Sequence, residues 1–192
     1  SQAGYVTCAQ ARGLGYSRRA LHYRYGQGLL TRVARGVYRV SFMPEPPFGD
    51  VVLARLVTDP ERAVASHWTA LELHELVATR SQQVHLTVPA SRRRRARAAL
   101  PWVKVHTAAD FPAVQVTSRS GIPVVLPARA IADVAAEGDL GAVYWGAQEA
   151  IRRGLATMDD IVRALRERRV PTGIRAEAER MLLGMIGRSG AA

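Results

Sequence analysis

Several residue types are scarce in this chain of 192 residues, and each scarcity excludes a class of protein. The single cysteine, Cys8, excludes a scaffold held together by disulfide bonds. No apolar run approaches the ~18 residues that a membrane-spanning helix needs, and no secretory signal is visible, so we expect a cytosolic protein without a membrane partner. The apolar fraction of 48% is nevertheless sufficient for a hydrophobic core, which argues against a disordered chain.

Acidic residues are absent from two stretches of the sequence, and these stretches carry the excess positive charge. Residues 1–40 contain seven arginines, and residues 76–109 contain six arginines and Lys104, without any Asp or Glu. The formal net charge of +11 is therefore local, because the rest of the chain has more acidic than basic residues. Two cationic surfaces of this kind suit a polyanion such as DNA or RNA. A coding bias could explain the preference for arginine over lysine, but it does not explain the missing acids.

The first of these stretches has the pattern of a winged helix-turn-helix. Thr7 and Ser17 are suitable N-cap residues for two short helices, over 8–12 and from 18 to about 28, which Gly13 separates. Two strands are predicted over 29–33 and 37–40, around a turn in which Gly36 can adopt a positive φ. We expect the second helix to enter a major groove of DNA and the hairpin to form the wing.

The polar face of the second helix and the wing supply the candidate contacts to DNA. We expect Arg19, His22 and Tyr23 to face bases. The other predicted contacts are to the backbone, and the full set of predicted DNA-binding residues is Ser17, Arg18, Arg19, His22, Tyr23, Arg24, Arg32 and Arg35. The alternative is that any hairpin after two helices shows this pattern and that the arginines only increase solubility.

The segment Pro44 to Gly49, PEPPFG, predicts a boundary between a DNA-binding domain over 1–43 and a larger C-terminal domain over 50–192. Residues 50–57 form a helix or a strand. Alternating segments then predict a small antiparallel sheet with one solvated face, with strands over 84–88, 102–106, 114–117 and 122–125. Helices over 128–137, 140–153, 157–168 and 176–186 predict a helical bundle, so the fold class is α+β.

Candidate catalytic or metal-binding groups in the C-terminal domain are weakly supported. A helix over 67–78, capped by Ser66, would carry His67 and His74 on one face, but the fragment HELVA lacks the second histidine of a zincin site. The polar residues of the strands, His85, Thr87, Lys104 and His106, have no carboxylate partner in these strands, and a solvated face explains them. We therefore predict no catalytic residue and no metal ligand.

A second basic patch lies between two of the predicted strands and consists of Arg92, Arg93, Arg94, Arg95 and Arg97. It would bind a second phosphate track, or an RNA that a partner holds. The alternative is a solvated run of charge.

Four segments together resemble the AbiEi family of antitoxins, which belong to type IV toxin-antitoxin systems. The segments are GYVTCAQARGLGYSRRALHYRYGQGLLTRVARGVYRV, SHWTALELHEL, VHLTVP and GIPVVLPARAIADVAA, in this order. The resemblance implies a winged-helix domain that binds operators in the promoter of its own operon. It also implies a larger C-terminal domain that is needed to neutralise a nucleotidyltransferase toxin. The sequence departs from the family where Val125 and Leu126 replace the usual Ser or Thr cap before Pro127, and where the first helix is short or absent.

These observations favour an antitoxin that represses its own operon, with operator DNA and a nucleotidyltransferase toxin as partners. One alternative is an antitoxin that acts as an atypical serine kinase on the toxin. The sequence contains no G-x-x-x-x-G-K-[ST] loop, no G-x-G-x-x-G and no kinase catalytic-loop signature, so no cofactor is predicted and an enzyme is disfavoured but left open. Another alternative is a plain winged-helix regulator with a ligand-sensing domain.

Overall fold

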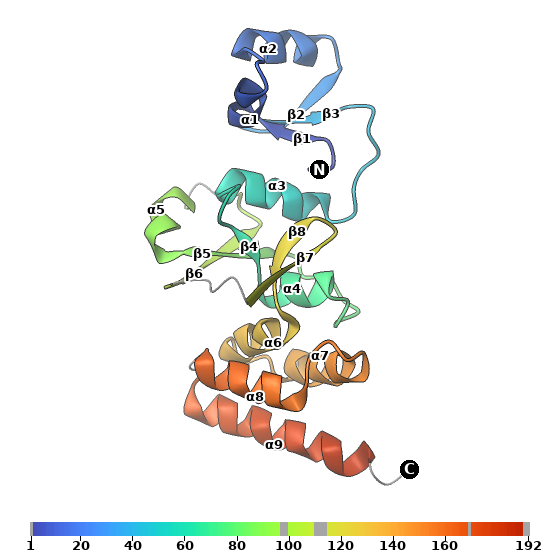
Figure 1. Cartoon of the computed structure of the whole chain (residues 1–192), viewed down its shortest axis with the longest axis vertical. Helices are drawn as coiled ribbons and strands as arrows, with labels where there is room; N and C mark the ends of the chain where they lie inside the picture. The colour runs from blue at the N-terminus through green and yellow to red at the C-terminus, as the bar shows by residue number, and fades with distance from the viewer. Residues whose placement is uncertain (1, 97–99, 110–114, 169, 190–192) are drawn as a thin grey trace.

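The computed structural model describes residues 2–96, 100–109, 115–168 and 170–189. Figure 1 shows three parts that follow one another along the long axis of the molecule. The N-terminal part contains two helices and a three-stranded sheet, the middle part contains a five-stranded sheet, and the last part contains helices alone.

The N-terminal part forms helices and strands where the sequence predicts them. Its elements are β1 (Tyr5–Thr7), α1 (Cys8–Gly13), α2 (Arg18–Gly26), β2 (Leu30–Ala34) and β3 (Val37–Val40). The strands form an antiparallel sheet in the order β1-β3-β2. The strand β1, which the sequence analysis did not predict, therefore stands directly before α1 and adds a third strand to the hairpin.

The predicted capping residues of this part are confirmed. The Thr7 hydroxyl accepts a hydrogen bond from the backbone of Gln10, whose side chain returns a bond to the Thr7 backbone. The Ser17 hydroxyl accepts a bond from the Ala20 backbone at 3.1 Å. Gly36 has a φ of 75°, as the predicted hairpin turn requires. These local signals are enough to fix where both helices and the turn begin.

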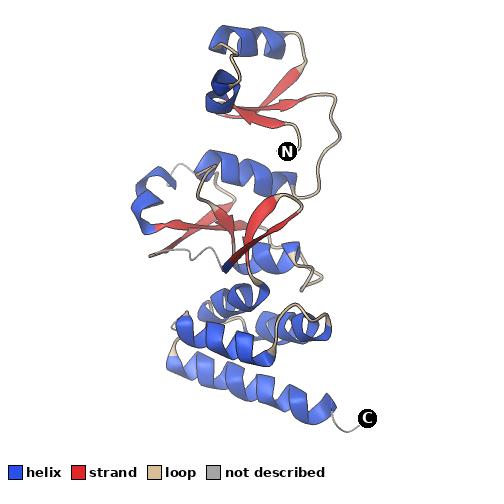
Figure 2. Ribbon diagram, in the orientation of Figure 1, coloured by secondary structure: helices blue, strands red, loops and turns tan. Residues whose placement is uncertain are grey.

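The middle part contains a mixed sheet rather than a wholly antiparallel one. Its order is β6-β5-β4-β8-β7; β4 pairs in parallel with β8, and β5 pairs in parallel with β6. The elements are α3 (Gly49–Thr58), β4 (Val64–Ala65), α4 (His67–Leu73), β5 (Val84–Pro89), η1 (Ala90–Arg92), α5 (Arg93–Ala96), β6 (Val103–Ala108), β7 (Val116–Arg119) and β8 (Ile122–Val125). Figure 2 shows α3 on one side of this sheet and α4 and α6 on the other.

Two expectations about this part are corrected. Ser66 does not cap α4, because its hydroxyl bonds instead to the side chains of His67 and Thr87, at 3.0 and 2.6 Å. The helix also ends at Leu73 rather than near residue 78, because Glu75 has a positive φ of 57° that turns the chain out of the helix.

The predicted solvated sheet face is also wrong for two of the four side chains that were placed on it. His85 and Thr87 are buried, with 4% and 3% of their surfaces exposed. The helix α4 packs on β5 and on α6, so helices cover the face that the alternating pattern marked as polar.

The last part consists of α6 (Pro127–Ala136), α7 (Leu140–Arg152), α8 (Met158–Glu167) and α9 (Thr172–Ser189). Pro127 stands in the first turn of α6, and the Thr157 hydroxyl caps α8, so these two helices begin within one residue of their predicted starts. Helix α9 begins at Thr172, four residues before its predicted start. Helix α6 contacts α4, α7, α8 and α9, and its apolar side chains are almost fully buried. It is thus the central helix that joins the sheet to the bundle.

One hydrophobic core runs from the N-terminal sheet into the rest of the molecule. Tyr5 and Val37 belong to the same cluster of buried residues as Val51 of α3. Helix α3 contacts all three strands of the N-terminal sheet. A smaller cluster of Ala11, Leu21 and Leu30 holds α1 and α2 on that sheet. The first 40 residues therefore have a small core of their own and also rest on α3.

Candidate nucleic-acid interface

A cationic hollow lies between α2 and the β2–β3 hairpin. Its volume is about 790 Å³. Five of the eight predicted DNA-binding residues line it: Arg18, Arg19 and His22 from α2, and Arg32 and Arg35 from the hairpin. Residues that are up to 17 positions apart in the sequence are thus brought to one surface by the fold of α2 against β2.

The four arginines of the hollow are not neutralised by any residue in the described part of the chain. Their side chains are exposed, and in the described ranges none of the four forms an ion pair or donates a hydrogen bond to another residue. The first acidic residue of the chain is Glu45. Four guanidinium groups without a carboxylate create a positive potential that attracts an anion. The N-terminus of α2, where Arg18 is the first helical residue, adds the positive end of a helix dipole.

Three predicted DNA-binding residues do not line the hollow. Ser17 is the N-cap of α2. Tyr23 is 66% exposed on the same helix. Arg24 lies with its guanidinium 4.8 Å from the centre of the Tyr16 ring and donates a 3.5 Å bond to the Ala20 carbonyl. Ser17 and Arg24 therefore already have roles within the fold.

The hollow also includes residues that were not predicted to lie in it, namely Cys8, Gly36 and Tyr38. Tyr38 is the partner of Arg32 in the β2–β3 register, and its ring packs against Tyr25 at a centroid distance of 6.3 Å. The predicted hairpin turn could have identified Tyr38, because a turn at residues 34–36 places positions 32 and 38 opposite each other.

The second basic patch differs from the hollow, because one of its arginines lies beside an acidic residue. The Arg92 guanidinium lies 3.9 Å from the carboxylate of the buried Asp59. Arg93 and Arg94 are exposed on α5. Arg95 also belongs to α5, and Arg97 lies outside the described residues.

Two other basic residues of the acid-free stretch 76–109 also form ion pairs. Arg80 forms ion pairs with Asp50 and Glu72, at 3.0 and 3.6 Å. Lys104 forms an ion pair with Glu137 at 2.6 Å. The sequence stretch lacks acids, but the folded surface around it does not.

His74 has the structural role that the sequence favoured for it. Its Nε2 atom lies 2.8 Å from the Val125 carbonyl, and Arg119 donates a 3.3 Å bond to its Nδ1 atom. A ring that accepts at Nδ1 and donates at Nε2 is neutral. Burial, with the nearby Arg119 and Arg153, lowers the pKa of His74 in agreement with this. His74 thus fastens the end of α4 to β8.

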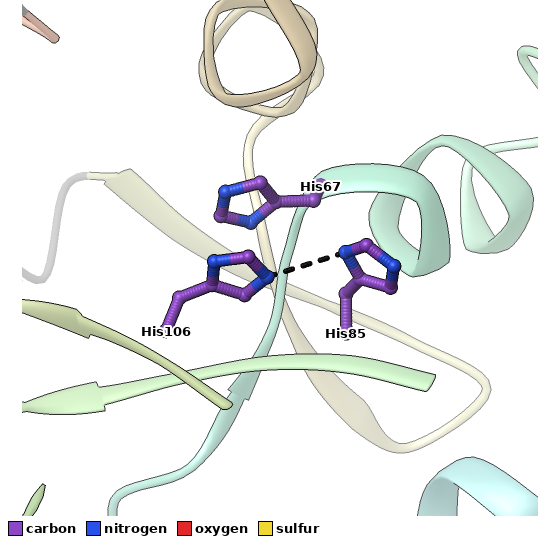
Figure 3. Close-up of side chains that lie close together, drawn as sticks. All are labelled: His67, His85 and His106. Atoms are coloured by element: carbon purple, nitrogen blue, oxygen red, sulfur yellow. Dashed lines mark hydrogen bonds between the residues drawn. The ribbon is translucent and has the colours of Figure 1, made fainter. Parts of the chain in front are cut away.

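The remaining three histidines of the C-terminal part are gathered into one cluster (Figure 3). His67 from α4 stacks on His106 from β6 at a centroid distance of 3.5 Å, and His106 is hydrogen-bonded to His85 from β5 at 3.2 Å. Burial lowers the pKa of all three, that of His106 to about 4, so the imidazoles are neutral at pH 7. His85 and His106 were predicted to share a sheet face, but His67 was assigned to the face of a separate helix, and its contact with them depends on the packing of α4 on β5.

The carboxylate that these strands lack comes from another element. Asp133 of α6 lies 3.9 Å from His67, and Glu137, just after α6, lies 4.0 Å from His106. Asp133 also forms an ion pair with Arg129, four positions earlier on α6, at 2.9 Å, and with Arg168 of the segment after α8. No pattern within the strands indicated that α6 would supply this partner.

Residues 1–41 match the family model described as "Transcriptional regulator, AbiEi antitoxin". The match spans β1 to β3 and includes every residue of the cationic hollow. This match supports the resemblance to AbiEi antitoxins over the N-terminal part, and it covers 41 of the 192 residues. A search among curated proteins gave no match. Among the helices that the structure describes, none is both long and apolar enough to cross a membrane.

Proposed function

We propose that the chain represses its own operon by binding operator DNA and counteracts a nucleotidyltransferase toxin, because residues 1–41 match the AbiEi antitoxin family model. The observation that supports the DNA-binding part is the cationic hollow. Four arginines converge there from two elements and have no acidic partner among the described residues, although Arg80, Arg92 and Lys104 are paired with acids elsewhere. Exposed positive charge without internal partners is the property that phosphate binding requires.

In this proposal, the N-terminal elements dock on DNA as a winged helix-turn-helix. Helix α2 enters the major groove, where Arg19 and His22 contact base edges, with Tyr23 at the exposed border of the helix. Arg32 and Arg35 of the hairpin hold phosphates beside it, as does Arg18 at the start of α2. Arg24 contributes its charge while it remains stacked on Tyr16.

An equilibrium titration tests the DNA-binding part. Fluorescence anisotropy with labelled DNA from upstream of the operon is compared with a scrambled duplex of the same composition. If about four phosphates are neutralised, log K should fall with log salt at a slope of roughly −4 for each bound chain. Equal affinity for the two duplexes at every salt concentration would contradict operator binding.

The antitoxin part is assigned to the region after the Pro44–Gly49 segment, as the resemblance implies. A truncated chain is a poor test of it, because removal of the N-terminal sheet would expose the face of α3 against which Tyr5 and Val37 lie. The better test uses the full chain with Arg19→Gln and Arg32→Gln, two changes at exposed positions.

Co-expression with the nucleotidyltransferase of the neighbouring reading frame separates the two activities. The double variant should lose repression of an operon reporter and still restore growth as well as the wild-type chain does. Failure of the wild-type chain to restore growth would contradict the antitoxin proposal and leave a plain transcriptional regulator. Loss of growth rescue only in the double variant would show that neutralisation also requires the hollow.

A further inference from the structure

The histidine cluster lies in the middle of the molecule and is not needed for the proposed DNA contacts. His67, His85 and His106 come from α4, β5 and β6, and their side chains point toward one another (Figure 3). His67 and His85 are 2% and 4% exposed, and the His106 side chain is 14% exposed. Each ring offers one nitrogen such that the three nitrogens lie within 4.8 Å of one another.

These distances are close to those of a metal centre. In a tetrahedral zinc site with metal–nitrogen bonds of ~2.0–2.1 Å, two ligand nitrogens are about 3.3 Å apart. The His106 Nε2 and His85 Nδ1 atoms are already 3.2 Å apart. The longest separation of 4.8 Å would have to shorten by only about 1.5 Å, which rotation of the rings about their side-chain bonds can supply.

The surroundings hold His67 in place in the way that metal-bound histidines are held. Its Nδ1 atom is 3.0 Å from the Ser66 hydroxyl, which is fixed by Thr87. The Oδ2 atom of Asp133, 3.9 Å from the same nitrogen, is buried and lacks a hydrogen-bond partner in the described part of the chain. A carboxylate or hydroxyl behind a ligating imidazole sets its tautomer and orientation. An unpaired buried oxygen beside the ring is otherwise a cost.

The backbone at His67 is strained toward the cluster. Its φ is 50°, in the left-handed region that non-glycine residues rarely adopt. Such a conformation is strained and persists where the surrounding structure enforces it, often at functional sites. Here it places the first residue of α4 directly over His106.

We propose that His67, His85 and His106 bind one divalent transition-metal ion of the zinc class, with Asp133 as a positioning residue behind His67. Three imidazoles suit zinc, cobalt or nickel ions, whereas magnesium and calcium prefer oxygen ligands. Three histidines leave a fourth position for water, on the side where His106 is partly exposed and Glu137 lies nearby. The site joins α4 to the parallel pair β5–β6, and the proposal does not depend on the DNA-binding role.

The test uses the full-length protein, first stripped with a chelator and then dialysed against Zn²⁺ or Co²⁺. Zinc content should reach one equivalent per chain, and the Co²⁺ form should show ligand-field absorption in the visible range. At free Zn²⁺ about 100-fold above Kd, the melting temperature should rise by roughly 5 to 10 °C, whereas Mg²⁺ should have no such effect. The wild-type chain alone therefore tests the proposal, whatever the fate of the variants.

Single variants His85→Asn and His106→Asn identify the ligands, with His22→Asn as the matched control. His22 lies in the N-terminal hollow, so its loss should leave the stoichiometry and the absorption bands unchanged. Each cluster variant should weaken metal binding at least tenfold, and Asp133→Asn should weaken it by roughly 10-fold with the same bands retained. Substoichiometric zinc in the wild-type chain, or unchanged binding in both cluster variants, would overturn the proposal.

Discussion

Asp133 is a buried carboxylate whose replacement by Asn should lower stability strongly although it hardly changes the shape of the side chain. It is 1% exposed and accepts bonds from Arg129 at 2.9 Å and from Arg168 at 2.5 Å. Both bonds go to Oδ1, so Asn, which has the same size, can keep both acceptor contacts but lacks the charge that strengthens them. One charge-assisted bond is worth about 1.5–3 kcal/mol, and the two arginines, 16% and 32% exposed, would remain partly desolvated. We expect Asp133→Asn to lower the free energy of unfolding by about 3 kcal/mol.

The assay is urea denaturation followed by circular dichroism, with a chelator present so that bound metal contributes nothing. The corresponding fall in melting temperature is roughly 6 to 12 °C. Asp159→Asn is the matched control, because Asp159 is exposed in the first turn of α8 and forms no ion pair with another described residue, which leaves its charge near the helix dipole. If Asp133→Asn changes stability by no more than this control does, the view of α6 as an electrostatically fixed central helix is wrong.

Two further predictions concern single side chains. Burial lowers the pKa of His74 below its ordinary value near 6.5, so the contribution of His74 to stability is complete above that pH and is lost as the pH falls. Between pH 7.5 and 5, the free energy of unfolding of His74→Gln should therefore decline less steeply than that of the wild-type chain, by up to about 1.4 kcal/mol per pH unit. Equal pH dependence of the two proteins in denaturation experiments would contradict this. Ser17→Ala should cost about 1 kcal/mol through the lost cap of α2, whereas Ser17→Asp should keep the cap but weaken DNA binding roughly tenfold by placing a carboxylate beside Arg18, as thermal melts and anisotropy titrations would show.

The N-terminal part could be predicted from the sequence because its signals are local. Ser17 and Thr7 cap helices through bonds to residues three positions away, and Gly36 fixes the turn between two adjacent strands. Once these elements are placed, Arg18 and Arg32 can meet only if α2 lies against the hairpin. The hollow therefore follows from short-range patterns and one packing contact.

The middle part was harder to predict because its pairings are not local. Alternating residues predict strands, but they do not distinguish parallel from antiparallel neighbours, and the two-residue strand β4 is too short to leave a pattern. Because His85 and Thr87 are polar, they were predicted to lie on a solvent-exposed face, yet they face α4 and Ser66 at its start. The alternation of polar and apolar residues shows which side chains share a face of the sheet, and the tertiary fold decides whether that face is exposed to solvent.

Outside the first 40 residues, the charge pattern of the sequence was a poor predictor of cationic surfaces in the folded molecule. Arg80 and Lys104 lie in a stretch without acids, but Asp50 and Glu137, at least 30 positions away, neutralise them. The sequence count therefore overstated the second cationic surface. Arg92 of the patch is paired with Asp59, whereas Arg93 and Arg94 on α5 are exposed; the hollow differs from the patch mainly because its arginines converge from two elements on one concave surface.

That difference can be measured directly with two double variants of equal charge change. Arg19→Gln with Arg32→Gln alters the hollow, and Arg93→Gln with Arg94→Gln alters exposed positions on α5. In anisotropy titrations on operator DNA, the first pair should raise Kd about 100-fold and make the salt slope shallower by about 1, because it removes a base contact and a phosphate contact. The second pair should raise Kd no more than about threefold. Equal losses from both pairs would contradict the assignment of the α2–hairpin hollow as the surface that binds the operator.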